Sequence, residues 1–438
     1  PPTTPPKTLF PYTTLFRSYE SEAMAEKFIR EGYEVVDFNE FSDVYVINTC
    51  TVTNMGDKKS RQIISRARRT NPDAIIAAVG CYSQMAPKEV SEIPGVDVVL
   101  GTRNKGDVVY YVNKAKDEGQ PQVHVQPVLQ NKKFEDLKIE DYQDKTRAFL
   151  KIQDGCNRFC TYCTIPYARG SVCSKDPNKV LEEVKELAAH GFKEVILSGI
   201  HTASYGLDLE GNINLINIIE EIEKIDGIER IRIGSIEPAF FTEEVVEKIK
   251  GFKKLCPHFH LSLQSGCDAT LKRMNRRYTA EEYEASVNML RETLPDVSIS
   301  TDVIVGFPGE TEEEFNETYE YLKRIHLTKT HVFKYSPRKG TKAADMPNQL
   351  DGTVKDIRSK ALIELNDKNE HAFTEKFIGR VMDVLIEKEI KDKPDFYEGY
   401  TRNYIKVIVH CMSADITGKI VDVKIEEAVE DYAIASMV

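Results

Sequence analysis

The sequence predicts an α/β protein of several domains: a doubly wound α/β domain, an open barrel of six β/α units and a small all-β barrel. Three observations predict this arrangement. The chain has 438 residues, too many for one ordinary core. Apolar runs alternate with helical segments as far as residue 372, which is typical of parallel sheets covered by helices. Short β runs then follow one another up to the last residue.

Composition narrows the class of protein. Hydrophobic residues make up 41%, enough for packed cores, and the formal charge of −11 argues against wholesale coating of nucleic acid. No run of about 18 apolar residues and no secretory signal pattern occurs, so we expect a cytoplasmic protein without a membrane span. The nine cysteines cluster by motif, which fits thiolate ligands in a reducing compartment.

Residues 1–18 do not look like the start of a domain, because they hold five prolines, five threonines and a repeated Thr-Leu-Phe. A disordered arm is one interpretation, and a foreign junction explains the repeat better. After this segment we predict four parts: an N-terminal domain at 19–115, a polar linker at 116–145, the open barrel at 146–372 and the all-β domain at 373–438.

In the N-terminal domain, two cysteines directly follow strands. Cys50 follows the strand predicted at 43–48, and Cys81 follows the strand at 73–79. The carboxyl ends of parallel strands share one edge of a sheet, where ligands gather. A ligand role for these two cysteines is therefore as plausible as core packing.

The helix predicted at 55–69 is basic. It carries Lys58, Lys59, Arg61 and three further arginines against one acid, Asp57. Such a run is usually a solvated face, but this one starts about two turns from the cysteine edge. We therefore predict phosphate contacts from Lys58, Lys59 and Arg61.

The open barrel begins with a cysteine loop. Its six strands are predicted at 147–153, 194–200, 228–236, 258–264, 298–305 and 329–335, with helices between them. Cys156, Cys160 and Cys163 follow the first strand at its carboxyl end, where barrel active sites lie. Three thiols leave one metal position vacant, which favours an iron–sulfur cluster. The alternative is a zinc knuckle completed by Cys173.

Polar residues also end the other barrel strands. Each could be a turn or a helix cap, but together on one rim they favour a cofactor pocket. They are Ser198 and Gly199, Glu237, Ser262 and Gln264, and the turn from Gly306 to Gly309. In the last domain, an OB-like barrel of five strands is expected, where Arg402 and Tyr404 could bind and stack on unpaired bases.

The block from Lys151 to Gly170, with Tyr162 before the last cysteine, resembles the radical S-adenosylmethionine (SAM) methylthiotransferases, and within them the branch acting on threonylcarbamoyladenosine in tRNA. The resemblance implies that Cys156, Cys160 and Cys163 hold a [4Fe–4S] cluster whose open iron binds SAM, which is cleaved to a 5′-deoxyadenosyl radical. It also implies an RNA-clamping TRAM domain at the end of the chain. The implied SAM contacts are Tyr162, Ser198, Gly199, Glu237, Ser262, Gln264, Gly306 and Gly309.

The resemblance further implies a second [4Fe–4S] cluster, which carries the sulfur that is methylated and transferred. Three cysteines hold it in the family, and Cys50 and Cys81 match two of them. The third would fall at about Thr14, inside the anomalous segment, where the sequence has no cysteine. The second cluster is therefore in doubt for this chain.

We expect an enzyme that inserts a methylthio group at C2 of N6-threonylcarbamoyladenosine at position 37 of tRNA. The C2–H bond is not acidic and has no leaving group, so a carbon radical is needed. The expected partners are an unstacked base in the anticodon loop, an electron donor and a sulfur donor, with the chain a monomer. Alternatives are a methylthiotransferase for isopentenyladenosine tRNA or a ribosomal-protein aspartate, and an RNA-binding Fe–S protein without productive methylthiolation.

Overall fold

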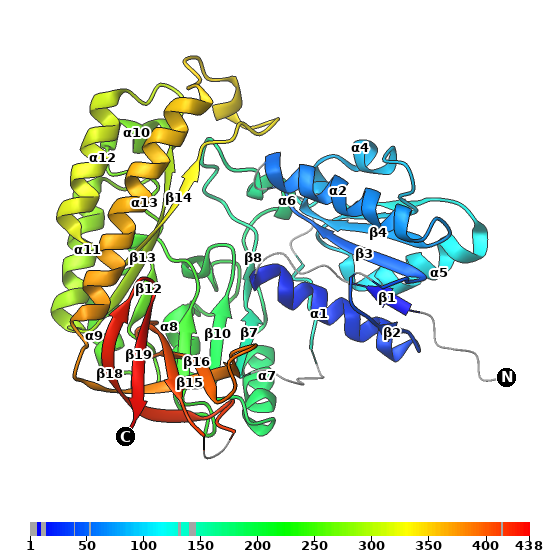
Figure 1. Cartoon of the computed structure of the whole chain (residues 1–438). Coiled ribbons are helices and arrows are strands. Elements are labelled where there is room, and N and C mark those ends of the chain that lie inside the picture. Colours follow the sequence, from blue (N-terminus) through cyan, green and yellow to red (C-terminus); the bar gives the residue numbers. More distant parts are fainter. Residues whose placement is uncertain are drawn as a thin grey trace. The chain divides into compact units, whose positions relative to one another are not determined.

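The computed structural model describes residues 7–9, 15–38, 40–51, 54–129, 133–139, 146–412 and 415–438. Its contacts divide the chain into two compact units (Figure 1). The first unit comprises Pro1–Tyr142, Gln153–Lys175 and Ser336–Ala344, and the second comprises Gln143–Ile152, Asp176–Tyr335 and Asp345–Val438. Two stretches of the barrel domain expected at 146–372 thus belong to the first unit. Within the described ranges, no helix has both the length and the apolar character of a membrane-crossing segment.

The first unit is built on one parallel sheet with the strand order β2-β1-β3-β4-β5-β6. Its strands are β1 (Lys7–Leu9), β2 (Glu34–Val35), β3 (Val44–Thr49), β4 (Ile75–Gly80), β5 (Val98–Leu100) and β6 (Gln122–His124). The strand β1 lies in the segment expected to be foreign, and β6 lies in the expected linker. Both are three residues long, too short for a periodic pattern to reveal them.

Helices cover both faces of this sheet, which confirms the doubly wound α/β class (Figure 1). On one face, α1 (Leu15–Arg30) and α5 (Val108–Glu118) bury Phe28 and Val112 against Val46. On the other, α2 (Asn54–Thr70) and α4 (Pro87–Ser91) pack Ile64 against Ile47. Successive strand residues point to opposite faces, so a sheet covered twice needs continuous apolar strands.

The second unit contains the six expected barrel strands in the expected order. They are β7 (Arg147–Lys151), β10 (Glu194–Ser198), β11 (Arg230–Ile233), β12 (His258–His260), β13 (Ser298–Val305) and β14 (Lys329–Lys334). They form two parallel sheets, β11-β10-β7 and β12-β13-β14, joined through the parallel bridges Ile231–Leu255 and Ile236–Leu261. The open arrangement of six β/α units is thereby confirmed.

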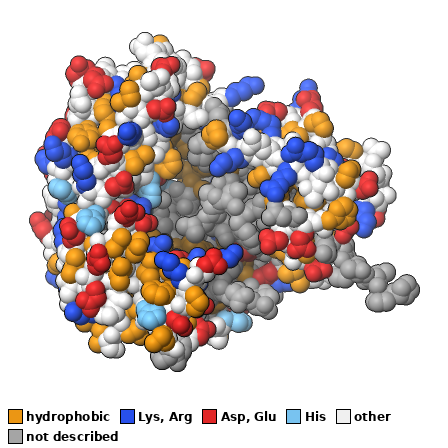
Figure 2. Space-filling view, viewed as in Figure 1, with side chains coloured by type: hydrophobic (Ala, Val, Ile, Leu, Met, Phe, Trp, Pro, Cys, Tyr) orange, Lys and Arg blue, Asp and Glu red, His pale blue; other side chains and the backbone are white. Residues whose placement is uncertain are grey.

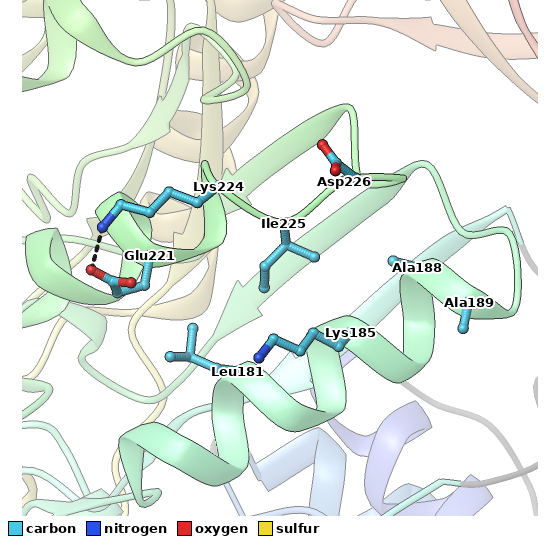
Figure 3. Close-up of a pocket in the computed structure, with 8 residues that line it drawn as sticks. All are labelled: Leu181, Lys185, Ala188, Ala189, Glu221, Lys224, Ile225 and Asp226. Atoms are coloured by element: carbon cyan, nitrogen blue, oxygen red, sulfur yellow. Dashed lines mark hydrogen bonds and ion pairs between the residues drawn. The ribbon is translucent and has the colours of Figure 1, made fainter.

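Helices alternate with these strands. They are α7 (Pro177–Ala189), α8 (Leu215–Ile222), α9 (Glu243–Gly251), α10 (Asp268–Arg273), α11 (Ala280–Thr293), α12 (Glu312–Ile325) and α13 (Gly352–Glu375). A cavity of about 570 Å³ lies between α7 and the end of α8, lined by Leu181, Lys185 and Ile225 (Figure 3). Its lining precedes β10 and β11 in the chain, so the cavity lies toward the amino ends of these strands. Barrel active sites lie at the opposite, carboxyl ends.

The chain ends in a closed five-strand barrel of the order β15-β16-β17-β19-β18, as expected. The strands are β15 (Val381–Glu389), β16 (Phe396–Thr401), β17 (Lys406–His410), β18 (Ile420–Val429) and β19 (Tyr432–Met437). Val384, Val407 and Val423 belong to its buried core.

A buried charge network attaches this small barrel to the amino ends of β7, β10 and β11. The Glu194 carboxylate, fully buried, accepts a hydrogen bond from Arg232 Nε at 2.9 Å, and Arg230 and Arg147 lie within 3.7 and 3.9 Å. Arg230 donates to the Tyr400 carbonyl oxygen at 2.8 Å. Burial acts to raise the pKa of Glu194, but Arg232, Arg147 and Arg230 hold it below its usual value.

We predict that Glu194→Gln lowers the free energy of unfolding by about 3 kcal/mol near neutral pH, because three buried cations lose their shared anion. A carboxylate with a lowered pKa stabilises the fold above its unfolded-state pKa of about 4.3, and this contribution is lost as the pH falls through the folded-state pKa. The difference between the variant and the original chain should therefore shrink in acid. Urea unfolding at several pH values measures it.

The control is Glu247→Gln, which removes an exposed carboxylate that lies 3.8 Å from Lys250. This change should leave the unfolding midpoint nearly unaltered. An equal loss of stability in both variants, or a Glu194→Gln loss that does not depend on pH, would contradict the assigned role.

Candidate functional site

The cysteine loop of the first unit is held in a defined backbone conformation. It runs from β8 (Gln153–Asp154) to α6 (Ile165–Arg169). Gly155 has φ 69°, and a Cβ there would lie 2.0 Å from the Ser171 carbonyl oxygen, so only glycine fits. The Cys156 amide donates to the Gly170 carbonyl at 3.0 Å, and the Cys163 amide donates to the Cys160 carbonyl at 3.0 Å. The sequence therefore fixes the loop at both ends and in its middle.

The donor set of this loop fits a [4Fe–4S] cluster. All three cysteines keep their thiols outside any disulfide among the described residues, with Cys160 buried and Cys156 and Cys163 half-buried. The described side chains of His, Cys, Asp and Glu nowhere gather in threes around a point that one metal ion could occupy. A cluster has no such requirement, because each of its ligands binds a different iron. Cys173, the fourth ligand in the alternative of a zinc site, is buried in β9 (Cys173–Ser174).

A network of buried ion pairs holds the cysteine loop in place. Arg169 Nη1 lies 3.1 Å from Glu20 Oε1 and 3.2 Å from Asp154 Oδ2, and Lys105 Nζ lies 2.6 Å from the same Glu20 oxygen. Burial acts to lower the pKa of Arg169, but the electrostatic influence of Cys81, Glu20 and Asp154 raises it well above its usual value. Arg169 thus connects the cysteine loop with α1 and with the neighbourhood of Cys81.

Cys50 and Cys81 lie at one edge of the first unit's sheet, as expected. The strands β3 and β4 are paired in register at Thr49 and Gly80, and each cysteine is the next residue of its chain segment. The first turn of α2 packs on Cys50, because a Cβ at Gly56 would lie 3.5 Å from Cys50 Sγ.

The third ligand expected at this edge has no counterpart. The strand β1 pairs in parallel with β3, so the carboxyl ends of both strands lie at the same edge of the sheet. Thr14, the position expected for the third cysteine, lies outside the described residues, and the sequence has no cysteine before Cys50. Two thiols of this chain suit a second cluster, but the set of three ligands that the family uses is incomplete here.

Residues 336–344 form a segment of the first unit that we call the bridging segment. Arg338 Nη2 lies 2.5 Å from both Asp57 Oδ2 and Thr51 Oγ1. Thr51 is the residue directly after Cys50. The Ala343 amide donates at 2.8 Å to the carbonyl oxygen of Thr161, a residue of the cysteine loop between Cys160 and Cys163. The bridging segment therefore contacts the surroundings of both cysteine sets. Sequence analysis missed it, and the only signal was a basic turn, Pro337-Arg338-Lys339-Gly340, after the sixth strand.

A pocket of about 700 Å³ opens beside these residues. Thr51, Tyr82 and Thr164 line it, and they are the residues that directly follow Cys50, Cys81 and Cys163. Arg338 and Lys339 of the bridging segment line it as well. The pocket therefore lies next to both sets of cysteines. Its volume is within the range of about 300–1,000 Å³ that holds small ligands.

The residues expected to contact SAM, other than Tyr162, lie in the second unit. Ser198 ends β10, with Gly199 next to it, and the Ser198 hydroxyl donates to the Leu150 carbonyl at 3.1 Å. Glu237 is buried and lies 3.1 Å from His201 Nε2 and 3.3 Å from Arg276 Nη2.

Among the remaining rim residues, Gln264 has φ 74° and bridges to Val303, while Gly306 and Gly309 have φ 71° and 75°. Ser262 is half-buried. Tyr162 lies in the cysteine loop of the first unit, half-buried. All the second-unit positions follow strands at their carboxyl ends, and their contact with SAM stays a prediction.

The predicted RNA contacts fall into two groups. Lys58 and Lys59 are exposed on α2, where basic side chains gather (Figure 2). Arg61 is half-exposed and donates to the Tyr82 hydroxyl at 2.8 Å. Arg402 and Tyr404 instead take part in the attachment of the small barrel to the strands of the second unit.

Two contacts define that attachment. Arg402 Nη2 donates to the Lys253 carbonyl at 2.5 Å, and the Tyr404 ring stacks on His258 with centroids 4.5 Å apart. Tyr404 also stacks on Tyr400 at 4.8 Å. Base stacking by Tyr404 would compete with these contacts, so RNA binding by Arg402 and Tyr404 stays a prediction.

Comparisons with known proteins agree with this architecture. Three family models match: the radical SAM superfamily at residues 150–322, the uncharacterized protein family UPF0004 at 16–101 and the TRAM domain at 375–438. A solved structure of the radical S-adenosylmethionine methyltransferase TsrM from Kitasatospora setae superposes with a TM-score of 0.57 at 17% identity. It covers 77% of this chain and 76% of TsrM, and it supports the fold alone.

Curated relatives match over nearly the whole length. The threonylcarbamoyladenosine tRNA methylthiotransferase MtaB of Bacillus subtilis is 44% identical and covers 94% of this chain and 92% of its own. MtaB of Aquifex aeolicus is also 44% identical, with coverages of 85% and 90%. The tRNA-2-methylthio-N(6)-dimethylallyladenosine synthase of Clostridium tetani is 38% identical, with coverages of 93% and 90%.

These matches and the geometry point the same way. The radical SAM model covers the cysteine loop, and that superfamily implies a [4Fe–4S] cluster and SAM, which the three thiols of the loop fit. The TRAM match covers the closed five-strand barrel and indicates tRNA binding. With relatives at 44% identity over 85% and 94% of the chain, this protein belongs to the radical SAM methylthiotransferase family.

Proposed function

We propose that this chain transfers a methylthio group to C2 of N6-threonylcarbamoyladenosine at position 37 of tRNA, next to the anticodon. The observation that carries the proposal is the 44% identity to MtaB of Bacillus subtilis over 94% of the chain. The dimethylallyladenosine synthase of Clostridium tetani, at 38%, makes the isopentenyl-type substrate the second candidate. Both candidates place the modified base in tRNA.

The chain's own residues account for how such chemistry would be housed. When bound, the cluster and SAM supply a carbon radical that can take the unactivated hydrogen from C2. Cys156, Cys160 and Cys163 would hold the cluster, and Gly155 allows the turn that brings them onto one loop. The ion network of Arg169 keeps that loop on the first unit. The pocket lined by Thr164 has room for a base next to the cysteine loop.

A second cluster is proposed for the edge that carries Cys50 and Cys81. The pairing of β3 and β4 brings these two positions together, and the family uses three cysteines there. Without a third cysteine before residue 50, the chain as it stands could instead be an RNA-binding Fe–S protein that does not methylthiolate. The sulfur donor, the electron donor, the monomeric state and the cytoplasmic location stay predictions.

The decisive test compares this chain with a version whose residues 1–18 are replaced by a family-like start that bears the cysteine. After anaerobic reconstitution, we expect about four irons in this chain and about eight in the repaired one. The repaired chain should convert N6-threonylcarbamoyladenosine in an anticodon stem–loop to its 2-methylthio form. Iron analysis and mass spectrometry of the RNA nucleosides provide both readouts.

Product on isopentenyladenosine but not on threonylcarbamoyladenosine would replace the first candidate by the second. Modification of a ribosomal protein with no change in tRNA would reject both. About four irons in the two versions alike would remove Cys50 and Cys81 from the cluster ligands.

We predict that Cys160→Ala abolishes formation of 5′-deoxyadenosine from SAM, because a loop with two thiolates should not hold the cluster. The matched control is Cys173→Ala, which removes a buried thiol outside the triad. This control should keep the iron content and the SAM cleavage. Undiminished cleavage in Cys160→Ala would refute the assignment of the loop, and iron loss in Cys173→Ala would revive the four-ligand site.

We also predict that replacing Lys58 and Lys59 with Ala weakens tRNA binding and flattens its dependence on salt. Two lost phosphate contacts should lower the slope of log K against log salt by about 1.4. The control replaces Lys114 and Lys116 of α5, which packs on the opposite face of the sheet from α2, with Ala. Fluorescence anisotropy with a labelled tRNA measures the slope, and equal slopes in both double variants would return Lys58 and Lys59 to an ordinary solvated surface.

A further inference from the structure

The lining of the pocket beside the two cysteine sets carries three acids and three cations, and the cations are not equally paired. A cation lies near each of the three acids. Asp57 Oδ2 lies 2.5 Å from Arg338 Nη2, Glu89 Oε1 lies 3.4 Å from Arg61 Nη1, and Glu92 Oε1 lies 3.9 Å from Lys88 Nζ. Arg61 is not a lining residue, so the lining is neutral overall, and within each of the three pairs the two charges cancel.

Lys339 is the remaining charged residue of the lining. It is exposed, and within the described part of the chain it has no ion pair. Its neighbour Arg338 is buried and anchored to Asp57 and Thr51, and Gly340 follows with φ 84°. Lys339 therefore lies in a turn whose preceding residue, Arg338, is held in place by Asp57 and Thr51. Among the charged residues that line the pocket, Lys339 is the one that no ion pair with a described residue neutralises.

The rest of the lining suits a base with a side arm. Met85, Ala86 and Pro87 give an apolar wall, and the Tyr82 ring lies in the same lining. The Tyr82 hydroxyl is already used, because it donates to Glu89 at 2.5 Å and accepts from Arg61. Flat apolar surface and one cation are the features that an anionic, base-containing ligand requires.

We propose that Lys339 binds the carboxylate of the substituent on N6 of the substrate adenine and so selects this base over one with a neutral, apolar substituent. The inference rests on the proposed function and names the residue that decides its substrate. The threonylcarbamoyl arm carries one carboxylate, and the isopentenyl arm carries none. The Lys339 ammonium would form a charge-assisted hydrogen bond with the threonylcarbamoyl carboxylate, which favours binding of that base. The isopentenyl arm would have to desolvate the ammonium without such a bond, which disfavours its binding.

The position of the arm also bears on the reacting carbon. C2 and C6 of adenine are both bonded to N1, so a contact that holds the substituent on N6 limits where C2 can lie. The pocket lining includes Thr164, next to Cys163, and Thr51, next to Cys50. A base held here by its arm would therefore present its ring near both cysteine sets. Lys339 is a specificity residue in this scheme and takes no part in the hydrogen transfer.

A phosphate of the anticodon loop is the other anion that Lys339 could meet. Phosphate contacts position RNA irrespective of the base, whereas a contact to the arm depends on the modification. We favour the carboxylate because Lys339 belongs to the lining of a pocket of about 700 Å³, next to the residues that follow the cysteines. A backbone phosphate would more naturally meet the exposed lysines of α2.

The test uses the full chain after anaerobic reconstitution and measures the binding of three anticodon stem–loops that differ only at position 37. They carry adenosine, isopentenyladenosine or threonylcarbamoyladenosine. We expect Lys339→Gln to weaken binding of the threonylcarbamoyl loop about tenfold and to leave the other two within about twofold. Lys339→Arg should restore most of the preference. Lys88→Gln is the matched control, since Lys88 lines the same pocket with the same charge but is paired with Glu92.

The outcomes separate this inference from the proposed function. Equal weakening of all three loops by Lys339→Gln would assign Lys339 to a phosphate and overturn the inference, while methylthiolation of threonylcarbamoyladenosine by the repaired chain would still stand. An equal effect of Lys88→Gln and Lys339→Gln on the preference would overturn it too. An original chain that binds the isopentenyl loop best, and a repaired chain that modifies only that loop, would reject both.

Discussion

The salt bridges of Arg169 are the interaction on which the site depends. This guanidinium is buried at the end of the cysteine loop and pairs with Asp154 before the loop and with Glu20 on α1. A buried charge is costly unless it is paired, so these groups must meet whenever the first unit folds. The network thus connects α1 with the strand β8 and the cysteine loop, which lie more than 120 positions later in the sequence. It accounts for the packing of residues 153–175 with the first unit.

Much of the fold could be predicted from the sequence because it is written in local patterns. Continuous apolar runs predicted the strands β3 and β4, and the spacing of Cys156, Cys160 and Cys163 predicted the loop that carries them. The edge shared by Cys50 and Cys81 followed from strand direction alone. These features need only the alternation of side chains and the rule that parallel strands end together.

Other features depend on which surfaces meet, and sequence patterns do not contain that information. Arg338 reaches Asp57 across more than 280 positions, from a turn with no periodicity. Tyr404 looked like a base-stacking residue because a tyrosine in a small barrel can face either solvent or a neighbour. Its partner His258 lies in another domain, and only the packed structure reveals the stack. The strand β6 was not predicted, because three residues are too few to show a periodic pattern.

The path of the chain between the two units has a consequence for dissecting the protein. The chain passes from one unit to the other after residues 142, 152, 175, 335 and 344. No single cut therefore separates a complete first unit from a complete second one. A fragment that stops before residue 336 would retain every cysteine of both sets yet lack the segment that contacts the surroundings of each. Gene truncation at apparent domain boundaries is thus unsuited to isolating either half, whereas circular permutation or point substitution preserves the interleaved path.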